Sequence, residues 1–293
     1  MTGYGEAVAY GAATIINAIA TGRGAAFGVD LWTKARVRLT ADAGNVEGKI
    51  IYEPSEDTSL IRAAVLTVFR YFHVIDRFGA YAETESNIPI AKGLKSSSAA
   101  ANALVLATAV ALGKKIEDTA VLNLSVDAAI KAKTTITGAF DDTCASFFGN
   151  VVVTDNLKRK ILRSFEIEED LDVLFHIPPQ KSYTYTSNVS RMKLIAPQVE
   201  IAFKEAVSGN YWNALTLNGM LYSAALGYNA ELAINALEAG AVASGLSGKG
   251  PATVAVVHSS KTRKVIDVWH SYNGEIIRAK INREKMKEVT RKE

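Results

Sequence analysis

Three serines directly after a lysine form the first feature of the sequence that could do chemistry. Residues 89–99 read PIAKGLKSSSA, and residues 100–113 continue as an alanine- and leucine-rich segment. The first backbone N–H groups of a helix lack partners within it, so a helix N-terminus attracts anions, and Lys92 and Lys95 would strengthen that attraction. The segment therefore predicts either a phosphate-binding site or a buried helix that Ser96 caps through its hydroxyl.

Two adjacent aspartates form the second candidate for chemistry. Asp141 and Asp142 lie in TGAFDDTCAS, residues 137–146, among small and apolar side chains. A carboxylate at such a place either caps the helix that follows or acts as a base or metal ligand. Successive residues point in different directions, so a single cap explains one of the two aspartates and leaves the other available for proton transfer near a bound phosphate.

A glycine-rich turn, SGLSGKGPATVAVV at residues 244–257, is the third candidate. A helix C-cap explains Gly245, whereas Gly248 and Gly250 indicate close approach of the backbone to a ligand or a neighbouring loop. The turn is not a dinucleotide-binding fingerprint, because that motif needs a strand before the glycines and a helix after them, and the predicted order here is reversed.

A polar segment at residues 178–191 could contribute to a substrate site. Lys181 and Arg191 lie there among tyrosines and hydroxyl residues, which could hold an anionic, hydroxylated small molecule. The alternative is that both cations are simply solvated in a loop.

Composition restricts the class of protein that these candidates belong to. The chain has 293 residues, 48% of them hydrophobic, and a net charge of +3 without a basic block that would predict a nucleic-acid partner. The lone cysteine excludes an intrachain disulfide, and the four scattered histidines argue against a transition-metal site. Apolar runs at 96–113 and 212–230 are interrupted by polar residues, so we expect buried helices of a soluble, cytoplasmic protein without a membrane partner or signal peptide.

The elements that must position the candidates follow from hydrophobic periodicity. Alternation at 33–40 predicts a strand, and helical spacing from Ser59 to Arg77 predicts a helix. Further helices are expected at about 96–112, 117–132, 191–207, 210–225, 230–243 and 261–271. Strands followed by helices and then by a second set of both predict an α+β fold, with one domain at 1–155 and another at 156–293.

The three motifs together resemble the superfamily of galactokinase, homoserine kinase, mevalonate kinase and phosphomevalonate kinase. PIAKGLKSSSA is similar to the superfamily motif P-x-x-x-G-L-x-S-S-A, GLSGKGPA to its C-terminal glycine motif, and TGAFDD to the segment that carries its catalytic aspartate. Within the superfamily, GLKSSSAAANA, TGAFDDTCAS and LNGMLYSAALGYNAE resemble the archaeal shikimate kinases.

The resemblance implies ATP-dependent phosphorylation of shikimate to 3-phosphoshikimate, with another small alcohol such as homoserine or mevalonate as the alternative acceptor. It implies the GHMP kinase fold, in which an N-terminal domain like domain 2 of ribosomal protein S5 precedes a ferredoxin-like domain. Asp141 would be the catalytic residue, Ser97 a Mg²⁺ ligand, and Gly248, Lys249 and Gly250 would support the phosphate loop or substrate. The implied ATP-binding residues are Pro89, Ile90, Ala91, Lys92, Gly93, Leu94, Lys95, Ser96, Ser97, Ser98 and Ala99.

Two positions depart from the superfamily pattern. Glu6 stands where many members have a lysine that assists the aspartate, and the metal-binding glutamate has no obvious counterpart. Asp127 is the nearest carboxylate upstream, with Asp142 as the alternative ligand. A non-catalytic regulator on this fold would be expected to lose Asp141 or the serines, and a decarboxylase would need an arginine cluster that we do not see. The oligomeric state is open, a homodimer being one option.

Overall fold

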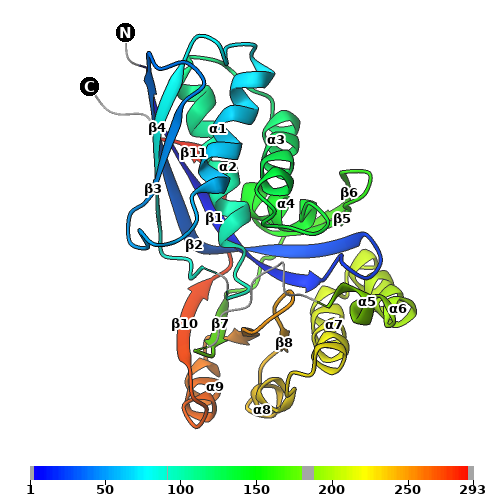
Figure 1. Ribbon diagram of the computed structural model, residues 1–293. Coiled ribbons are helices and arrows are strands. Elements are labelled where there is room, and N and C mark those ends of the chain that lie inside the picture. The colour runs from blue at the N-terminus through cyan, green and yellow to red at the C-terminus, as the bar shows by residue number, and fades with distance from the viewer. Residues whose placement is uncertain (1–2, 91, 180–187, 290–293) are drawn as a thin grey trace.

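The computed structural model describes residues 3–90, 92–179 and 188–289. It contains two β-sheets, each covered by helices, stacked end to end in the view of Figure 1. The predicted α+β class is confirmed. Among these residues no helix is both long and apolar enough to cross a membrane.

The first sheet is built around a long antiparallel ribbon of β1 and β2. Its order is β11-β1-β2-β4-β3, with β5 and then β6 added along the first part of β2. All pairings are antiparallel except that of β3 with β4. The strands are β1 (Tyr4–Ile16), β2 (Arg23–Thr40), β3 (Val46–Ile50), β4 (Gly79–Ser86), β5 (Val151–Asp155), β6 (Lys160–Phe165) and β11 (Lys287–Glu288).

Four helices accompany the first sheet: α1 (Ser59–Tyr71), α2 (Ser96–Ala111), α3 (Asp118–Lys131) and α4 (Phe140–Phe148). Alanines make α2 thin, and glycines in β1 let it lie very close to the strand. A Cβ on Gly5 would overlap the carbonyl oxygen of Ala107, and one on Gly3 would overlap that of Ala111. α2 also packs against β2, α1, α3 and α4, which explains why it is apolar on nearly every side.

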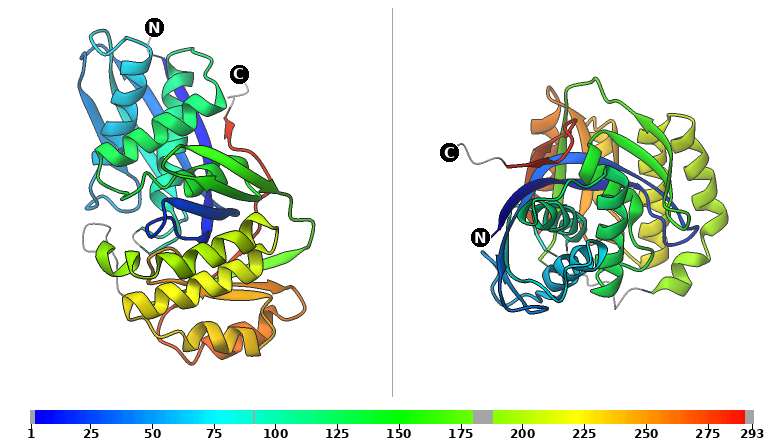
Figure 2. Two further views of the ribbon diagram at one scale, coloured as in Figure 1. Left: turned by 90° about the vertical axis from the view of Figure 1, so that its right-hand side faces the viewer. Right: turned by 90° about the horizontal axis from the view of Figure 1, so that it is seen from above.

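The second sheet has the antiparallel order β10-β7-β9-β8. Its strands are β7 (Leu171–Ile177), β8 (Ala243–Leu246), β9 (Thr253–His258) and β10 (Glu275–Lys280). Its helices are α5 (Val189–Lys193), α6 (Ala196–Val207), α7 (Tyr211–Leu226), α8 (Glu231–Glu238) and α9 (Thr262–Trp269). Figure 2 shows α6 and α7 side by side next to the tip of the β1–β2 ribbon.

One hydrophobic core is shared by the two sheets. Ile15 and Phe27 of the ribbon lie in the same buried cluster as Phe203 of α6 and Leu215 and Tyr222 of α7. Both β6 and β11 lie beyond residue 155 in the chain, yet they pair with the first sheet. The domain boundary at 155 stays a prediction, and the two parts are joined by a common core.

Several predicted boundaries differ from the structure. The strand predicted at 33–40 is the end of a single strand, β2, that already begins at Arg23. The helix expected at 191–207 is interrupted between α5 and α6, because Pro197 starts a new helix. The helix predicted from Ser59 to Arg77 ends at Tyr71, and residues 243–246 extend as β8.

Substitution of Gly219 by alanine should destabilise the fold, although alanine is the better helix former by about 1 kcal/mol. A Cβ on Gly219 in α7 would lie 2.5 Å from Cα of Gly245 in β8 and 2.7 Å from the backbone nitrogen of Leu246. Overpacking against backbone costs about 1–3 kcal/mol, so the steric effect wins. We expect Gly219→Ala to lower the melting temperature by about 2–4 °C.

Asn213→Ala provides a matched control, because Asn213 is exposed on the same helix. Its melting temperature should stay equal to that of the unchanged chain or rise slightly. Equal melting temperatures for the two variants would contradict the close packing of α7 on β8.

Candidate active site

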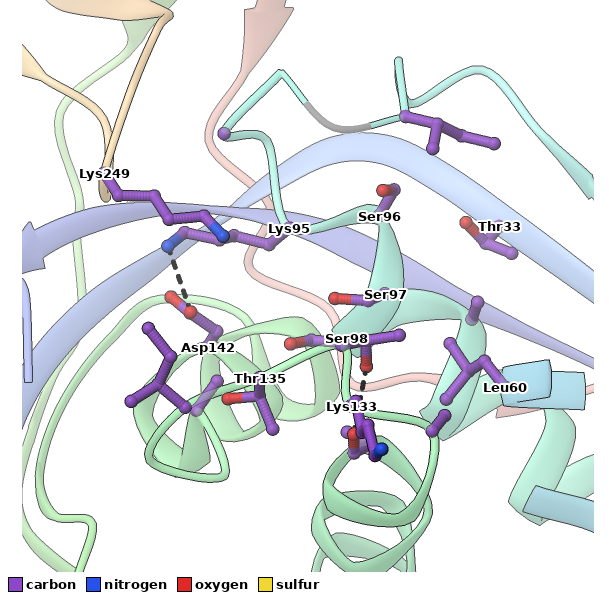
Figure 3. Close-up of a pocket in the computed structure, with 18 of the residues that line it drawn as sticks. Thr33, Leu60, Lys95, Ser96, Ser97, Ser98, Lys133, Thr135, Asp142 and Lys249 are labelled. Carbon is purple, nitrogen blue, oxygen red and sulfur yellow. Dashed lines mark hydrogen bonds and ion pairs between the residues drawn. The ribbon is translucent and has the colours of Figure 1, made fainter. Parts of the chain in front are cut away.

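A cavity of about 750 Å³ opens at the N-terminus of α2. Its lining comes from β1, from the start of α2, from the segment that joins α3 to α4, and from the glycine-rich turn between β8 and β9. Figure 3 shows the hydroxyl groups of Ser96, Ser97 and Ser98 along one side of it and the ammonium groups of Lys95 and Lys249 at one end. The three motifs of the sequence therefore meet in one place.

The start of α2 is not capped by a serine. Lys95 is the N-cap residue, with a left-handed φ of 65°, and no side chain of the described residues makes a capping hydrogen bond there. Ser96 is the first helical residue, so the capping alternative is wrong. A helix N-terminus without a side-chain cap that faces a cavity suits an anionic ligand.

The loop before α2 is attached to the glycine-rich turn. The hydroxyl of Ser247 donates to the carbonyl of Gly93 at 2.9 Å, and the N–H of Ala252 donates to the carbonyl of Lys92 at 3.3 Å. Gly93 has a φ of 91°, and a Cβ on it would lie 2.9 Å from the carbonyl oxygen of Ser247. Glycine is required there by both the backbone conformation and the close approach.

The predicted ATP-binding residues divide into those that line the cavity and those that support it. Ile90, Gly93, Lys95, Ser96, Ser97 and Ser98 line it. Leu94 and Ala99 are buried in the core, and the ammonium group of Lys92 donates to the carbonyls of Pro178 and Pro179 at 2.8 and 2.6 Å. Pro89 precedes the loop without lining the cavity, and Ala91 lies outside the described residues.

Both aspartates lie in the first turn of α4 and line the cavity. The N-cap residue of α4 is Ala139, so neither aspartate occupies the capping position, and the expectation that one of them caps the helix is wrong. Oδ2 of Asp142 forms an ion pair with Nζ of Lys95 at 3.0 Å, drawn as a dashed line in Figure 3. Its Oδ1 is buried and accepts no hydrogen bond from the described residues.

Asp141 is almost fully buried, which changes its acidity. Its Oδ1 accepts a hydrogen bond from Nδ2 of Asn156 at 2.7 Å. Burial, and then the neighbouring charge of Asp142, raise the pKa of Asp141 to about 7, against the opposing effects of Lys95 and Asn156. A carboxylate with such a pKa can exchange a proton near neutral pH.

The glycine-rich turn brings the second lysine to the cavity. Gly248 lies beside Lys95, since a Cβ on it would be 2.7 Å from Nζ of that residue. Lys249 lines the cavity, and its burial, together with the charge of Lys95, lowers the pKa of its ammonium group to about 8. Gly250 has a φ of 76° and packs against Tyr228. Two lysines, Lys95 and Lys249, and two aspartates therefore line the cavity at the N-terminus of α2.

Known proteins resemble this chain over nearly its whole length. The "Shikimate kinase" of Methanosarcina acetivorans is 46% identical over 288 residues, covering 96% of this chain and 95% of that protein. The chain belongs to the archaeal shikimate kinase family. The protein of the same name from Pyrococcus furiosus is 45% identical over 267 residues, 91% of this chain and 95% of its own. Residues 59–150 match the family described as the GHMP kinases N terminal domain.

Solved structures confirm the predicted GHMP kinase fold. Homoserine kinase from Cytophaga hutchinsonii superposes with a TM-score of 0.77 at 16% identity, covering 99% of this chain and 98% of that one. Mevalonate kinase from Methanococcus jannaschii gives a TM-score of 0.77 at 14% identity, covering 94% and 98%. At these identities the likeness concerns the fold, and the shikimate kinase family membership rests on the whole-length relatives.

Several residues that the sequence suggested are not brought to the cavity. Asp127 of α3 forms an ion pair with Arg159 at 2.7 Å and does not line it. Arg191 is an exposed residue of α5 away from the cavity lining, and Lys181 lies outside the described residues. Glu6, at the position of the superfamily lysine, lies 3.7 Å from both Lys34 and Arg36 on the first sheet.

Sequence reasoning missed polar residues that the strands contribute. Thr14 and Asn17 near the end of β1, and Thr33 of β2, also line the cavity. Thr14 is buried, and its hydroxyl finds no hydrogen-bond partner among the described residues. A polar side chain inside an otherwise apolar strand, as in AATIINA, was the available signal.

Asp141→Asn should make the free protein more stable at alkaline pH. An aspartate of the unfolded chain loses its proton near pH 4, whereas Asp141 in the folded chain keeps it until about pH 7. Between these values the folded state binds more protons, so its stability falls as pH rises. We expect the asparagine variant to melt a few degrees above the unchanged chain at pH 8, with the difference shrinking toward pH 4.

Thermal unfolding at several pH values measures this effect, and Asp267→Asn, at an exposed helical position, is the control. The control should leave the melting temperature and its pH dependence unchanged. A lower melting temperature for Asp141→Asn at pH 8 would show that the buried carboxylate does not weaken the fold.

Proposed function

We propose that the chain transfers the γ-phosphoryl group of ATP to the 3-hydroxyl group of shikimate in this cavity. The observation that carries the proposal is the combination of whole-length relationship to the shikimate kinases with a serine-rich helix N-terminus that faces a buried aspartate. A cytoplasmic location belongs to the same proposal, whereas a homodimer stays a prediction.

The triphosphate would lie at the start of α2. Backbone N–H groups and the hydroxyls of Ser96 and Ser97 supply hydrogen-bond donors, and Lys95 and Lys249 supply positive charge. The apolar part of the cavity, which includes Leu60, Ile61 and Ala129, suits the base of the nucleotide. Phosphate binding by a helix N-terminus and two lysines needs no P-loop motif.

A magnesium ion fits this arrangement with few ligands from the protein. Oδ1 of Asp142 is buried without a hydrogen-bond partner in the described part of the chain, and the hydroxyl of Ser97 lines the same cavity. Within those residues no three histidine, cysteine, aspartate or glutamate side chains gather to hold a metal. Magnesium bound to nucleotides takes most of its ligands from phosphates and water, and it would neutralise charge on the triphosphate. Asp142 suits it better than Asp127.

Asp141 would orient the acceptor hydroxyl and accept its proton. Its pKa of about 7 keeps the carboxylate ionised at slightly alkaline pH while leaving it basic enough to take a proton. In-line phosphoryl transfer requires positioning and charge stabilisation more than covalent chemistry. The cavity offers the start of α2 and Asp141 for positioning, and Lys95 and Lys249 for charge stabilisation. Lys95, which pairs with Asp142, is the cation closest to the role of the superfamily lysine that Glu6 replaces.

The acceptor is tested by an ADP-release assay with shikimate, homoserine, mevalonate and galactose. We expect turnover with shikimate alone, because the whole-length relatives carry that name. Asp141→Asn should lower turnover by at least about 100-fold while ATP still binds, since it removes the base and leaves the helix N-terminus intact. Turnover of another alcohol in place of shikimate would refute the acceptor, and near-normal turnover of the variant would refute the role of Asp141.

ATP binding should take up a proton at Lys249. The pKa of this lysine is lowered to about 8, and a nearby triphosphate would raise it again. At pH 8.5 part of the lysine is neutral in the free protein, so binding draws a proton from solution. Titration calorimetry in two buffers with different ionisation enthalpies measures the uptake.

Lys249→Met is the matched variant, because methionine preserves most of the volume and removes the charge. The uptake at pH 8.5 should fall sharply in this variant. At pH 6.5 Lys249 is already protonated in the unchanged chain, so the two proteins should differ little there. Equal uptake by both at pH 8.5 would place the lysine away from the phosphates.

A further inference from the structure

Asp141 is held by a buried side chain that none of the motifs contains. Asn156 lies just after β5, is almost fully buried and donates from Nδ2 to Oδ1 of Asp141 at 2.7 Å. The two residues come from different elements, since Asp141 lies in the first turn of α4 and Asn156 follows the strand that pairs with the start of β2. Their contact links the site to the first sheet.

The orientation of this amide follows from what each partner can offer. In its ionised form, the one that can take a proton, the carboxylate of Asp141 only accepts hydrogen bonds, so the NH₂ group of Asn156 faces it. Its Oδ1 then faces the other way and accepts from the hydroxyl of Thr154 at 2.6 Å. The same hydroxyl lies 3.3 Å from the carbonyl oxygen of Gly24. The carboxylate thus sets which way the amide faces, and Thr154 supplies the donor that satisfies the buried Oδ1 of Asn156.

The first sheet places Gly24, Thr154 and Asn156 together. Gly24 and Thr154 are opposite each other in the register of β2 and β5, and the backbone N–H of Asn156 donates to the carbonyl of Gly22 at 2.9 Å. A Cβ on Gly24 would overlap Oδ2 of Asp141. The carboxylate of Asp141 thus lies in the space left by the missing side chain of Gly24. The hydrogen bond from Asn156 sets the orientation of the carboxylate plane.

We propose that Asn156 is a positioning residue for Asp141, and that Thr154 and Gly24 hold the pair in its working geometry. This inference rests on the proposed phosphoryl transfer, in which Asp141 meets the acceptor hydroxyl. Asn156 occupies one oxygen of the carboxylate and leaves the other for the acceptor. An amide suits this task because it donates a hydrogen bond without competing for the proton.

Thr154→Val and Thr154→Ser form a matched pair that tests the arrangement. Valine preserves the shape of threonine and removes the hydroxyl, whereas serine preserves the hydroxyl. With valine the buried Oδ1 of Asn156 loses its hydrogen-bond donor and the amide is held less firmly against Asp141, so kcat should fall about 10-fold with an unchanged KM for ATP. Serine should restore kcat to within about twofold of the unchanged chain. Equal kcat values for the two variants would overturn the role of Thr154.

Asn156→Ala tests the central contact, and it should lower kcat by about 10- to 100-fold, again with little change in KM for ATP. If Asn156 acts through Asp141, the loss must disappear in the Asp141→Asn background, because the carboxylate to be positioned is already gone. Single-turnover assays with enzyme in excess can measure the slow variants. A further loss of similar size in the double variant would show a general structural role and overturn the proposal.

Two controls separate this inference from the proposed function. The kinetic series uses whichever alcohol the unchanged chain phosphorylates, so a wrong acceptor does not affect it. If no alcohol in the panel is phosphorylated, the side-chain amide resonance of Asn156 in ¹⁵N-labelled protein without ligand still tests the contact. It should shift strongly on Asp141→Asn and little on the exposed Asp267→Asn, and equal shifts would contradict it.

Discussion

Burial of two adjacent carboxylates is the constraint on which the rest of the site depends. Asp141 and Asp142 are both nearly inaccessible to water, and each charge there must be compensated. Lys95 compensates Asp142 through an ion pair, and Asn156 compensates Asp141 through a hydrogen bond. These partners come from the start of α2 and from the end of β5, so the carboxylate pair requires both elements to be in place.

Small residues make this arrangement possible. The last turn of α2 lies directly on β1 because Gly3 and Gly5 have no side chain there. Asp141 reaches its place because Gly24 has no Cβ, and Gly93 lets the loop before α2 contact the glycine-rich turn. At each of these positions a side chain would collide with a neighbouring group, and glycine has none. The cavity is thus shaped by close approaches that larger residues would prevent.

The second sheet contributes more than support. Its glycine-rich turn carries Lys249 to the α2 N-terminus and is bonded to the loop before that helix through Ser247. The shared core around Phe27 and Tyr222 holds the two sheets together, and with them the glycine-rich turn and the start of α2. The positive charge near the proposed phosphates therefore comes from both parts of the chain, and neither part contains the whole site.

The sequence by itself determined the class of fold, the family and the three motifs that meet at the cavity. Local patterns suffice for these, because a serine-rich helix start, an aspartate pair and a glycine turn are contiguous in the chain. Only the tertiary structure decided that Lys95 rather than Ser96 ends the loop, that Asp142 lies in the cavity while Asp127 pairs with Arg159, and that Asn156 holds Asp141. Those outcomes depend on strand register and on contacts between distant segments. No local pattern encodes which of several carboxylates will lose its water and find a partner across the fold.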